Sequence, residues 1–384
     1  MLGGNETAAR AERCVRLSGL RPSATVAERM GRRIVVTGGA GFIGANVAVS
    51  LARRDPSAHV IAVDNLKRRG SELNLPRLRD GGVEFVHADV RELADLDGLT
   101  DVDALVECSA EPSVLAGTDG SPDYLIGSNL VGAYNCLELA RRNEAFMVFL
   151  STSRVYPVGI LENLRLEEHD SRYELSADQD VLGVSGAGIS EAAPLAGART
   201  LYGTTKLAAE LLIEEYRATY GLRAVIDRCG VVAGPWQMGR VDQGVFTYWV
   251  LAHHFRRPLS YIGFGGSGKQ VRDLLHVDDL ADLIAEQLAS IDTWDGLTLN
   301  VGGGRECSLS LRETTAICAD LTGNSLEVRV SGETRPGDVP IYLSDCSKLF
   351  GVTNWRPKSG AREVLTDTYR WVLDNETAIA KALC

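Results

Sequence analysis

The stretch Ile34-Val35-Val36-Thr37-Gly38-Gly39-Ala40-Gly41-Phe42-Ile43-Gly44 decides the fold of this chain. Three β-branched residues open it and predict a short strand. Glycines follow at G-x-x-G-x-x-G spacing, which lets the loop turn tightly and brings backbone N–H groups close to a pyrophosphate at the start of the next helix. Residues 45–53 continue as a helix-like segment. Glycine-rich turns are common, but this order of strand, loop and helix predicts a dinucleotide-binding unit.

A second strand-like run, residues 60–63, ends in Asp64 and Asn65, 20 residues after Gly44. A carboxylate at that strand end accepts hydrogen bonds from an adenosine ribose and repels a 2′-phosphate. Asp64 therefore favours NAD over NADP, the alternative being a solvated strand-end acid. The basic cluster Lys67-Arg68-Arg69 weighs against that preference.

Strand-like and helix-like runs then alternate along the chain. We expect strands at 83–86, 104–106, 146–150 and 223–227, and helices at 128–141 and from Tyr202 to about 221. This alternation predicts an α/β fold with a Rossmann-type, doubly wound parallel sheet covered on both faces. The nucleotide-binding domain is expected over 33–235. Its long insertion at 157–199 is expected to form a partly ordered flap near the active site.

Segments become shorter after residue 235. Strand-like runs at 298–301 and 327–330 and helix-like runs at 309–321 and 362–375 predict a smaller mixed α/β C-terminal substrate lobe. This lobe is expected over 236–384, with some segments returning to the nucleotide-binding domain. Residues 1–32 are polar and weakly patterned and are expected to be an N-terminal extension. Either the start is placed too early, with Met30 as the true one, or the segment is an ordered arm at a subunit contact.

Composition excludes several classes of protein. The 384 residues carry a net charge of -11, which argues against nucleic-acid binding. The eight cysteines form no C-x-x-C pair, and several lie in apolar runs, so we expect reduced core thiols. The six histidines show no clustered metal-ligand spacing, so no metal site is expected. Because no membrane span or signal-peptide core is visible, we expect a soluble cytoplasmic protein.

A candidate catalytic pair lies in Leu201-Tyr202-Gly203-Thr204-Thr205-Lys206, which opens an amphipathic run. Tyr202 and Lys206 are four residues apart, so both side chains lie on one helix face. A phenol has an unperturbed pKa of about 10, and a nearby ammonium favours the phenolate. In isolation such a pair usually means one packed ring and one solvated charge. The glycine loop upstream favours the catalytic interpretation.

Taken together, these separated motifs resemble the extended short-chain dehydrogenase/reductase family, specifically its NAD-dependent nucleotide-sugar epimerases and dehydratases. The resemblance covers roughly residues 32–375. The matching stretches are 37–44, Asp64-Asn65-Leu66, Asp89-Val90-Arg91, Asn129, Ser151-Thr152, Val155-Tyr156, 202–206, Val271-Arg272-Asp273, 276–280, Asn300-Val301-Gly302 and Arg335-Pro336-Gly337-Asp338.

This resemblance implies a catalytic set of Thr152, Tyr202 and Lys206. Tyr202 is implied to be the acid/base, Lys206 to bond the nicotinamide ribose and Thr152 to orient the sugar hydroxyl. The implied NAD-binding residues are Gly38, Gly41, Phe42, Ile43, Gly44, Asp64, Asn65, Asp89, Val90, Ser109, Asn129, Tyr202 and Lys206. The implied residues for a nucleotide-diphosphate sugar are Thr152, Ser153, Arg154, Trp236, Gln243, Arg272, Arg335 and Asp338. Arg272 and Arg335 are implied to contact its diphosphate.

Ser153 and Arg154 discriminate between reactions within this family. At this place the pattern of sugar 4,6-dehydratases is Thr-Asp-Glu, and that of sugar-acid decarboxylases is Thr-Ser-Glu. This chain has Thr152-Ser153-Arg154. Since the acidic pair is missing, elimination is disfavoured. Oxidation, presentation of the other face of a keto sugar and reduction remain, and these steps define an epimerase, an isomerase.

The C-terminal half narrows the expectation further. Residues 241–244 and 268–276 are similar to those of CDP-paratose (CDP-tyvelose) 2-epimerases, which oxidise the sugar at C2. The alternatives are a nucleotide-sugar 4-epimerase, a net oxidoreductase that releases NADH, and a non-enzymatic NAD-binding scaffold. The resemblance also implies a homodimer, because helices after the fourth and fifth strands often pair into a four-helix bundle in this family.

Overall fold

The β-branched opening stretch forms strand β1 (Arg33–Thr37) at the centre of the molecule. Its side chains alternate between two cores, because successive residues of a strand point to opposite faces. Ile34 and Val36 belong to one core and Val35 to the other. The computed structural model describes residues 31–118, 120–240 and 243–383. Residues 1–30 of the expected extension, and part of the 241–244 motif, lie outside these ranges.

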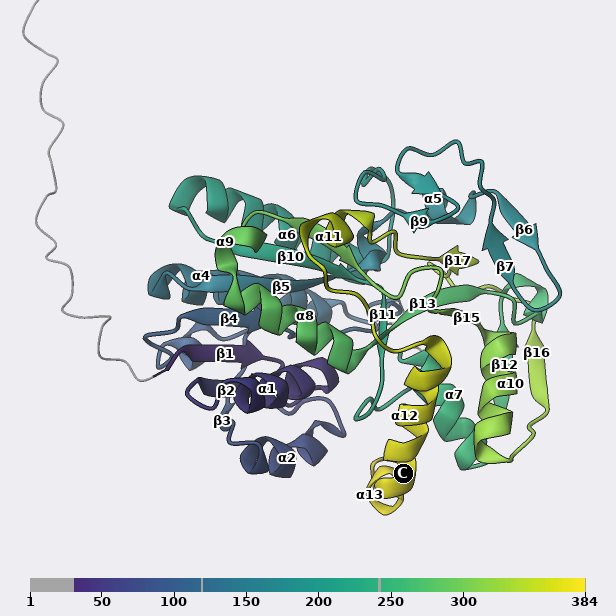
Figure 1. Ribbon diagram of the computed structural model, residues 1–384, viewed down its shortest axis with the longest axis horizontal. Helices are drawn as coiled ribbons and strands as arrows, with labels where there is room; N and C mark the ends of the chain where they lie inside the picture. Colours follow the sequence, from purple (N-terminus) through teal and green to yellow (C-terminus); the bar gives the residue numbers. More distant parts are fainter. Residues whose placement is uncertain (1–30, 119, 241–242, 384) are drawn as a thin grey trace, which may run out of the picture. The chain divides into compact units, whose positions relative to one another are not determined.

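Seven parallel strands form the central sheet, in the order β14-β10-β5-β4-β1-β2-β3 (Figure 1). The other six strands are β2 (His59–Asp64), β3 (Glu84–His87), β4 (Ala104–Glu107), β5 (Phe146–Thr152), β10 (Ala224–Cys229) and β14 (Thr298–Val301). The expected Rossmann-type sheet is confirmed. The strand order reverses between β1 and β4, which is where sheets of this kind bind ligands beyond the carboxyl ends of their strands.

Strand β14 corrects one expectation. Thr298–Val301 was assigned to the smaller lobe, but it is the edge strand of the central sheet, with Thr298 beside Ile226 of β10. Leu299 and Val301 are buried in the same core as Ile34. The apolar run is too short to reveal from sequence which sheet it completes.

Helices cover both faces of this sheet, as the alternation predicted. Helices α1 (Phe42–Arg54) and α8 (Val277–Ala289) contribute to the core of Ile34, and α4 (Gly132–Asn143) and α6 (Leu201–Tyr220) to the core of Val35. A π-helical turn, η4 (Gly127–Val131), joins α3 (Asp123–Ile126) to α4, so the helix expected at 128–141 starts earlier and is interrupted. Shorter elements are η2 (Ser71–Asn74), α2 (Leu75–Asp80), η3 (Leu93–Leu96), α9 (Ile291–Trp294) and α11 (Ser347–Val352).

The insertion at 157–199 is folded, which corrects the expected partly ordered flap. It forms α5 (Val158–Glu162), the hairpin β6 (Leu166–Glu168) and β7 (Tyr173–Leu175), and the hairpin β8 (Val184–Ser185) and β9 (Gly188–Ile189). Leu161, Leu175 and Ile189 bury their side chains against Leu343 and its neighbours. The insertion is therefore part of a core, and none of its described residues lines the cavities described below.

The smaller lobe is a mixed α/β structure, as expected. Its strands are β11 (Val231–Ala233), β13 (Val271–His276), β15 (Ser308–Ser310) and β17 (Ile341–Tyr342), beside the pair β12 (Leu259–Ile262) and β16 (Val328–Ser331). Its helices are α7 (Val245–His254), α10 (Leu311–Thr322), α12 (Ala361–Asp374) and α13 (Glu376–Leu383), with the 3-10 turn η6 (Phe264–Gly266). No described helix has the length and apolarity needed to cross a bilayer. The described cysteines are free thiols: 108, 136, 229, 307, 318 and 346.

Candidate active site

Two adjoining cavities open beyond the carboxyl ends of the parallel strands. The first cavity, of about 540 Å³, is lined by the glycine loop, the end of β5, the start of α6 and segments of the smaller lobe. The second cavity, of about 330 Å³, is lined by the glycine loop, the end of β2 and residues 108–113. Gly38 and Gly41 line both cavities, so the glycine loop is their common wall.

The glycine loop has this shape because side chains do not fit in it. Gly38 has a φ of 60°, and a Cβ there would lie 2.7 Å from the carbonyl oxygen of Cys108. A Cβ on Gly44 would lie 2.2 Å from the carbonyl oxygen of Gly38. Asp64 holds the loop, since its carboxylate accepts hydrogen bonds from the N–H groups of Ala40 at 3.1 Å and Leu66 at 2.8 Å. Burial raises the pKa of Asp64, and these backbone donors oppose the rise.

This arrangement fits a dinucleotide. The first turn of α1 faces the first cavity through Phe42, Ile43 and Gly44, so its positive end is directed at the place of a pyrophosphate. The second cavity carries the strand-end acid expected to contact the ribose. Besides Gly38 and Gly41, its walls include four predicted NAD residues: Asp64, Asn65, Val90 and Ser109.

Two further predicted NAD residues lie behind the walls. Asp89 accepts a hydrogen bond from Asn65 at 3.0 Å and pairs with Arg91 at 2.7 Å. The hydrogen bonds with Arg91, opposed by burial, lower the pKa of Asp89 to about 2. Asn129, in the π-helical turn, exchanges hydrogen bonds with the backbone of Glu111. Both residues therefore shape the walls of the second cavity without lining them.

The predicted catalytic residues meet at the first cavity. Thr152 ends β5, and Tyr202 and Lys206 occupy the first turns of α6. Tyr202 shares a hydrogen bond with the side chain of Thr152. Burial raises the pKa of Tyr202, while the Lys206 ammonium and the Thr152 hydrogen bond oppose the rise. The three side chains can thus hold a substrate hydroxyl and pass its proton.

A close approach of α6 to β5 brings these residues together. Thr200 caps α6 by accepting a hydrogen bond from the N–H of Gly203 at 3.2 Å. A Cβ on Gly203 would lie 2.0 Å from the carbonyl oxygen of Arg154, so another residue there would push the helix away. The glycine next to Tyr202 therefore sets the position of the Tyr202 phenol.

Glu107 is a site residue to which no role was assigned from the sequence. It ends β4, is buried, and places its carboxylate 3.3 Å from Nζ of Lys206. The same ammonium lies 4.0 Å from the ring centroid of Phe149. Burial raises the pKa of Glu107, and the Lys206 ammonium opposes that rise. Its place at a strand end was visible in the sequence, but its partner 99 positions away was not.

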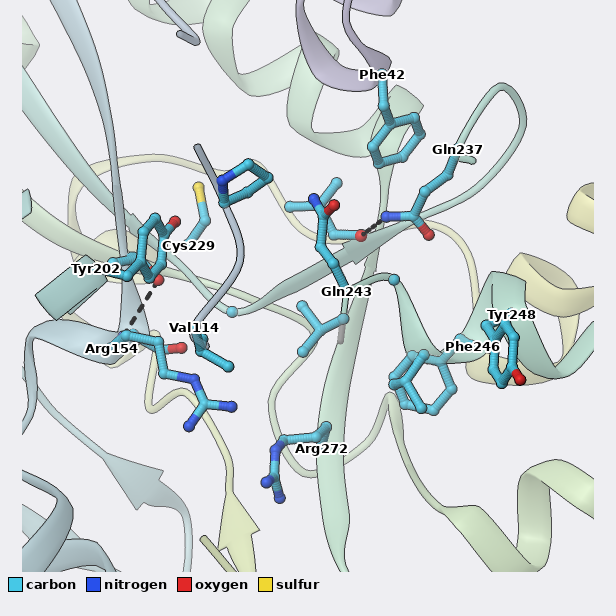
Figure 2. A pocket seen from close by; sticks show the side chains of 18 of the residues that line it. Phe42, Val114, Arg154, Tyr202, Cys229, Gln237, Gln243, Phe246, Tyr248 and Arg272 are labelled. Atoms are coloured by element: carbon cyan, nitrogen blue, oxygen red, sulfur yellow. Dashed lines mark hydrogen bonds between the residues drawn. The ribbon is translucent and has the colours of Figure 1, made fainter. Parts of the chain in front are cut away.

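The predicted substrate residues Ser153, Arg154, Gln243, Arg272, Arg335 and Asp338 all line the first cavity. Figure 2 shows Tyr202 and Arg154 on one side, with Phe246 and Tyr248 across from them and Arg272 below. Arg272 pairs with Asp338 at 2.6 Å and also donates to the carbonyl oxygen of Val339 at 2.7 Å. Gln243 accepts a hydrogen bond from Arg68, which connects the smaller lobe to the loop after β2.

Trp236 is the predicted substrate residue that does not line either cavity. Its φ of 73° turns the ring away, and the ring packs against Trp371 with centroids 5.8 Å apart and against Arg77. Its neighbour Gln237 lines the first cavity instead. The left-handed backbone at Trp236 could not be read from the sequence, because such a conformation is unusual for a bulky side chain.

Comparison with known proteins places this geometry in a family. The model of the NAD dependent epimerase/dehydratase family matches residues 34–302, which include the glycine loop, Thr152, Tyr202 and Lys206. The chain belongs to this family.

The proteins that are similar to this chain catalyse more than one class of reaction. CDP-paratose 2-epimerase of Salmonella typhi is 28% identical, over 88% of this chain and 98% of the relative. dTDP-glucose 4,6-dehydratase of Mycolicibacterium smegmatis is 30% identical, over 90% and 94%. Among solved structures, UDP-glucose 4-epimerase of Thermus thermophilus in complex with NAD superposes with a TM-score of 0.69 at 26% identity, over 88% and 98%. The cofactor of this family member is NAD, and the relatives act on nucleotide sugars.

Proposed function

We propose that this family member is a nucleotide-diphosphosugar epimerase, an isomerase that oxidises one sugar carbon transiently and reduces it on the opposite face. The observation that carries the proposal is the set Thr152, Tyr202 and Lys206 at one cavity, with Ser153 and Arg154 following Thr152. The similarity to CDP-paratose 2-epimerase supports C2 as the reacting carbon, with a 4-epimerase as the alternative.

The proton steps fall to residues of this chain. Thr152 orients the substrate hydroxyl, and Tyr202 accepts its proton and returns it during reduction. Lys206 stabilises the phenolate by its charge. When bound, NAD supplies the reversible acceptance of a hydride, so oxidation and reduction balance within one turnover.

The described residues that line the first cavity do not supply the pair of carboxylic acids that elimination of water requires. Asp338 is the single carboxylate among the described residues that line the first cavity, and it is paired with Arg272. Arg154 occupies the position at which the dehydratase pattern of the family has a glutamate. A guanidinium does not act as a base near neutral pH. This difference supports epimerisation over dehydration.

A panel of nucleotide sugars tests the proposal. We expect NAD to survive gel filtration with the protein and NMR to show inversion at one ring carbon. Absorbance at 340 nm should not rise during turnover. Stoichiometric release of NADH would identify a net oxidoreductase instead, and a 4-keto-6-deoxy product would identify a dehydratase. A protein that binds NAD and converts no nucleotide sugar would be the non-enzymatic NAD-binding scaffold.

We also propose that the protein is a homodimer. Val131 in the π-helical turn and Tyr134 on α4 are 42% and 43% exposed, and Leu211 on the neighbouring helix α6 is 56% exposed. Apolar side chains exposed on two adjacent helices favour contact with a second copy through α4 and α6. The cytoplasmic location expected from the sequence stays a prediction.

A further inference from the structure

Arg154 is a cation at the first cavity whose nearest acidic influence, Asp338, is already paired with Arg272. Lys206 is paired with Glu107, and Arg272 with Asp338. The Arg154 side chain donates a hydrogen bond from Nη1 to the carbonyl oxygen of Gly337 at 2.9 Å, and among the described residues it forms no ion pair. Burial, reinforced by the charge of Arg272, lowers the pKa of Arg154 to about 10, so it stays protonated near neutral pH.

A half-buried charge of this kind is costly unless a ligand neutralises it. Removing a cation from water costs several kcal/mol when no counter-ion compensates it. The planar guanidinium of arginine binds carboxylate and phosphate groups with two parallel hydrogen bonds. Since Arg154 lines the cavity, an anionic group of the substrate can supply the missing partner.

The place of Arg154 limits where this anionic group lies. Its backbone N–H donates to Oγ1 of Thr152 at 3.2 Å, and its charge acts on Tyr202. Figure 2 shows the two side chains of Arg154 and Tyr202 beside each other. Since Arg154, Thr152 and Tyr202 line the same cavity, a substrate whose reacting hydroxyl meets Thr152 and Tyr202 presents its neighbouring groups to the Arg154 guanidinium.

Given the proposed epimerase function, on which this inference rests, we propose that Arg154 binds an anionic group carried by the ring carbon next to the one that is oxidised. Two groups of a nucleotide-diphosphosugar meet this description. One is the β-phosphate on C1, beside a reacting C2, and the other is a carboxylate on C5, beside a reacting C4. A neutral sugar that reacts at C4 carries neither group, so the proposal excludes neutral hexoses inverted at C4.

Equilibrium binding tests the site independently of turnover. The NAD-loaded Tyr202→Phe protein is titrated with UDP, CDP, UDP-glucose, CDP-glucose and UDP-glucuronate by calorimetry, with and without Arg154→Gln. If Arg154 binds the β-phosphate, Arg154→Gln weakens all probes that bind by a similar factor, about 10- to 100-fold. If it binds a carboxylate, UDP-glucuronate alone is weakened. Arg154→Lys, which keeps the charge, restores part of the affinity in either case.

Controls and turnover complete the test. Arg199→Gln is the matched control, because Arg199 also donates to a backbone carbonyl and lies near α6 but does not line the cavity. Wild-type turnover followed by NMR should invert C2 in the first case and C4 of the uronate in the second. The proposal is overturned if Arg154→Gln leaves every affinity within about twofold, if no probe binds, or if the wild type inverts C4 of UDP-glucose. Loss of affinity without any turnover would refute the epimerase function and keep the anion site.

Discussion

Tyr202 carries its phenol in surroundings that oppose ionisation. Burial raises its pKa, and the Lys206 ammonium, the Thr152 hydroxyl and the Arg154 charge oppose the rise. The phenol is therefore suited to hold its proton until a substrate hydroxyl and the positively charged nicotinamide of NAD⁺ arrive. At the scale of the residue, the reaction depends on a few charges placed around one oxygen.

Tyr202→Phe tests the assigned acid/base. We expect the rate of sugar inversion to fall by about 10²- to 10⁴-fold, because the proton has no acceptor, while the ring stays packed. Inversion is followed by NMR, and bound NAD by the absorbance ratio of the purified protein. Full retention of activity with the cofactor in place would disprove the assignment.

Glu107→Gln tests whether Glu107 positions and tunes Lys206. Glutamine keeps an oxygen near Nζ of Lys206 but removes a negative charge, so the Lys206 charge acts more strongly on Tyr202. The pKa of Tyr202 should fall, and the acidic limb of the pH–rate profile should move to lower pH by about one unit.

A matched carboxylate separates this effect from a general loss of charge. Glu138 pairs with Arg141 and accepts a hydrogen bond from Tyr216, farther along α6. Glu138→Gln should leave the pH–rate profile in place. Identical profiles for both variants and the wild type would rule out a tuning role for Glu107.

At the scale of the element, α6 and β10 are joined by buried charges beneath the site. Arg228 of β10 pairs with Glu210 of α6 at 2.7 Å, and Glu210 also accepts a hydrogen bond from Ser151 of β5 at 2.5 Å. Breaking such a buried pair leaves an uncompensated charge. The network fixes the helix that carries Tyr202 against the strand that carries Thr152.

A buried acid on β10, Asp227, makes stability depend on pH. Asp227 is buried and accepts a hydrogen bond from Gln287 of α8 at 3.0 Å. Burial raises the pKa of Asp227 from 3.8 to about 7, with the Gln287 bond opposing. The folded protein therefore keeps a proton on Asp227 that the unfolded chain has already released, and the stability from this group is lost as the pH rises from about 4 to 7.

Asp227→Asn removes this titration and keeps the acceptor for Gln287. We expect the variant to become more stable relative to the wild type as the pH rises. The difference in their unfolding free energies should grow by about 2–3 kcal/mol between pH 5 and pH 8. Urea denaturation of the NAD-loaded proteins measures it. Parallel curves for wild type and variant would contradict the shifted pKa.

At the scale of the whole molecule, the proposed dimer uses the face of α4 and α6 that points away from the sheet. Leu211→Glu should raise the dimer dissociation constant about 100-fold or more, because each copy stops burying a leucine worth about 1.5–3 kcal/mol. Sedimentation equilibrium measures the constant. Leu182→Glu is the control, since Leu182 is 74% exposed on the insertion. A wild type that stays monomeric at micromolar concentration would refute the dimer.

The sequence by itself determined the Rossmann-type sheet and the NAD cofactor, and it proposed a catalytic set. Each of these rests on local patterns, since a glycine loop after a strand, and Tyr202 and Lys206 one helical turn apart, are readable within a few positions. The seven-stranded sheet and the family match confirm the fold and the cofactor. The roles assigned to Thr152, Tyr202 and Lys206 stay predictions for the variants above.

Only the tertiary structure decided which distant groups meet. Four contacts join residues far apart in the chain: Glu107 with Lys206, β14 with β10, the insertion with the segment around Leu343, and Arg154 with Gly337. Sequence periodicity reports which face of an element is buried, but it does not report what that face is buried against. Arg154 was thus visible as a missing glutamate, and the fold shows it as a half-buried cation at the cavity that Thr152 and Tyr202 also line.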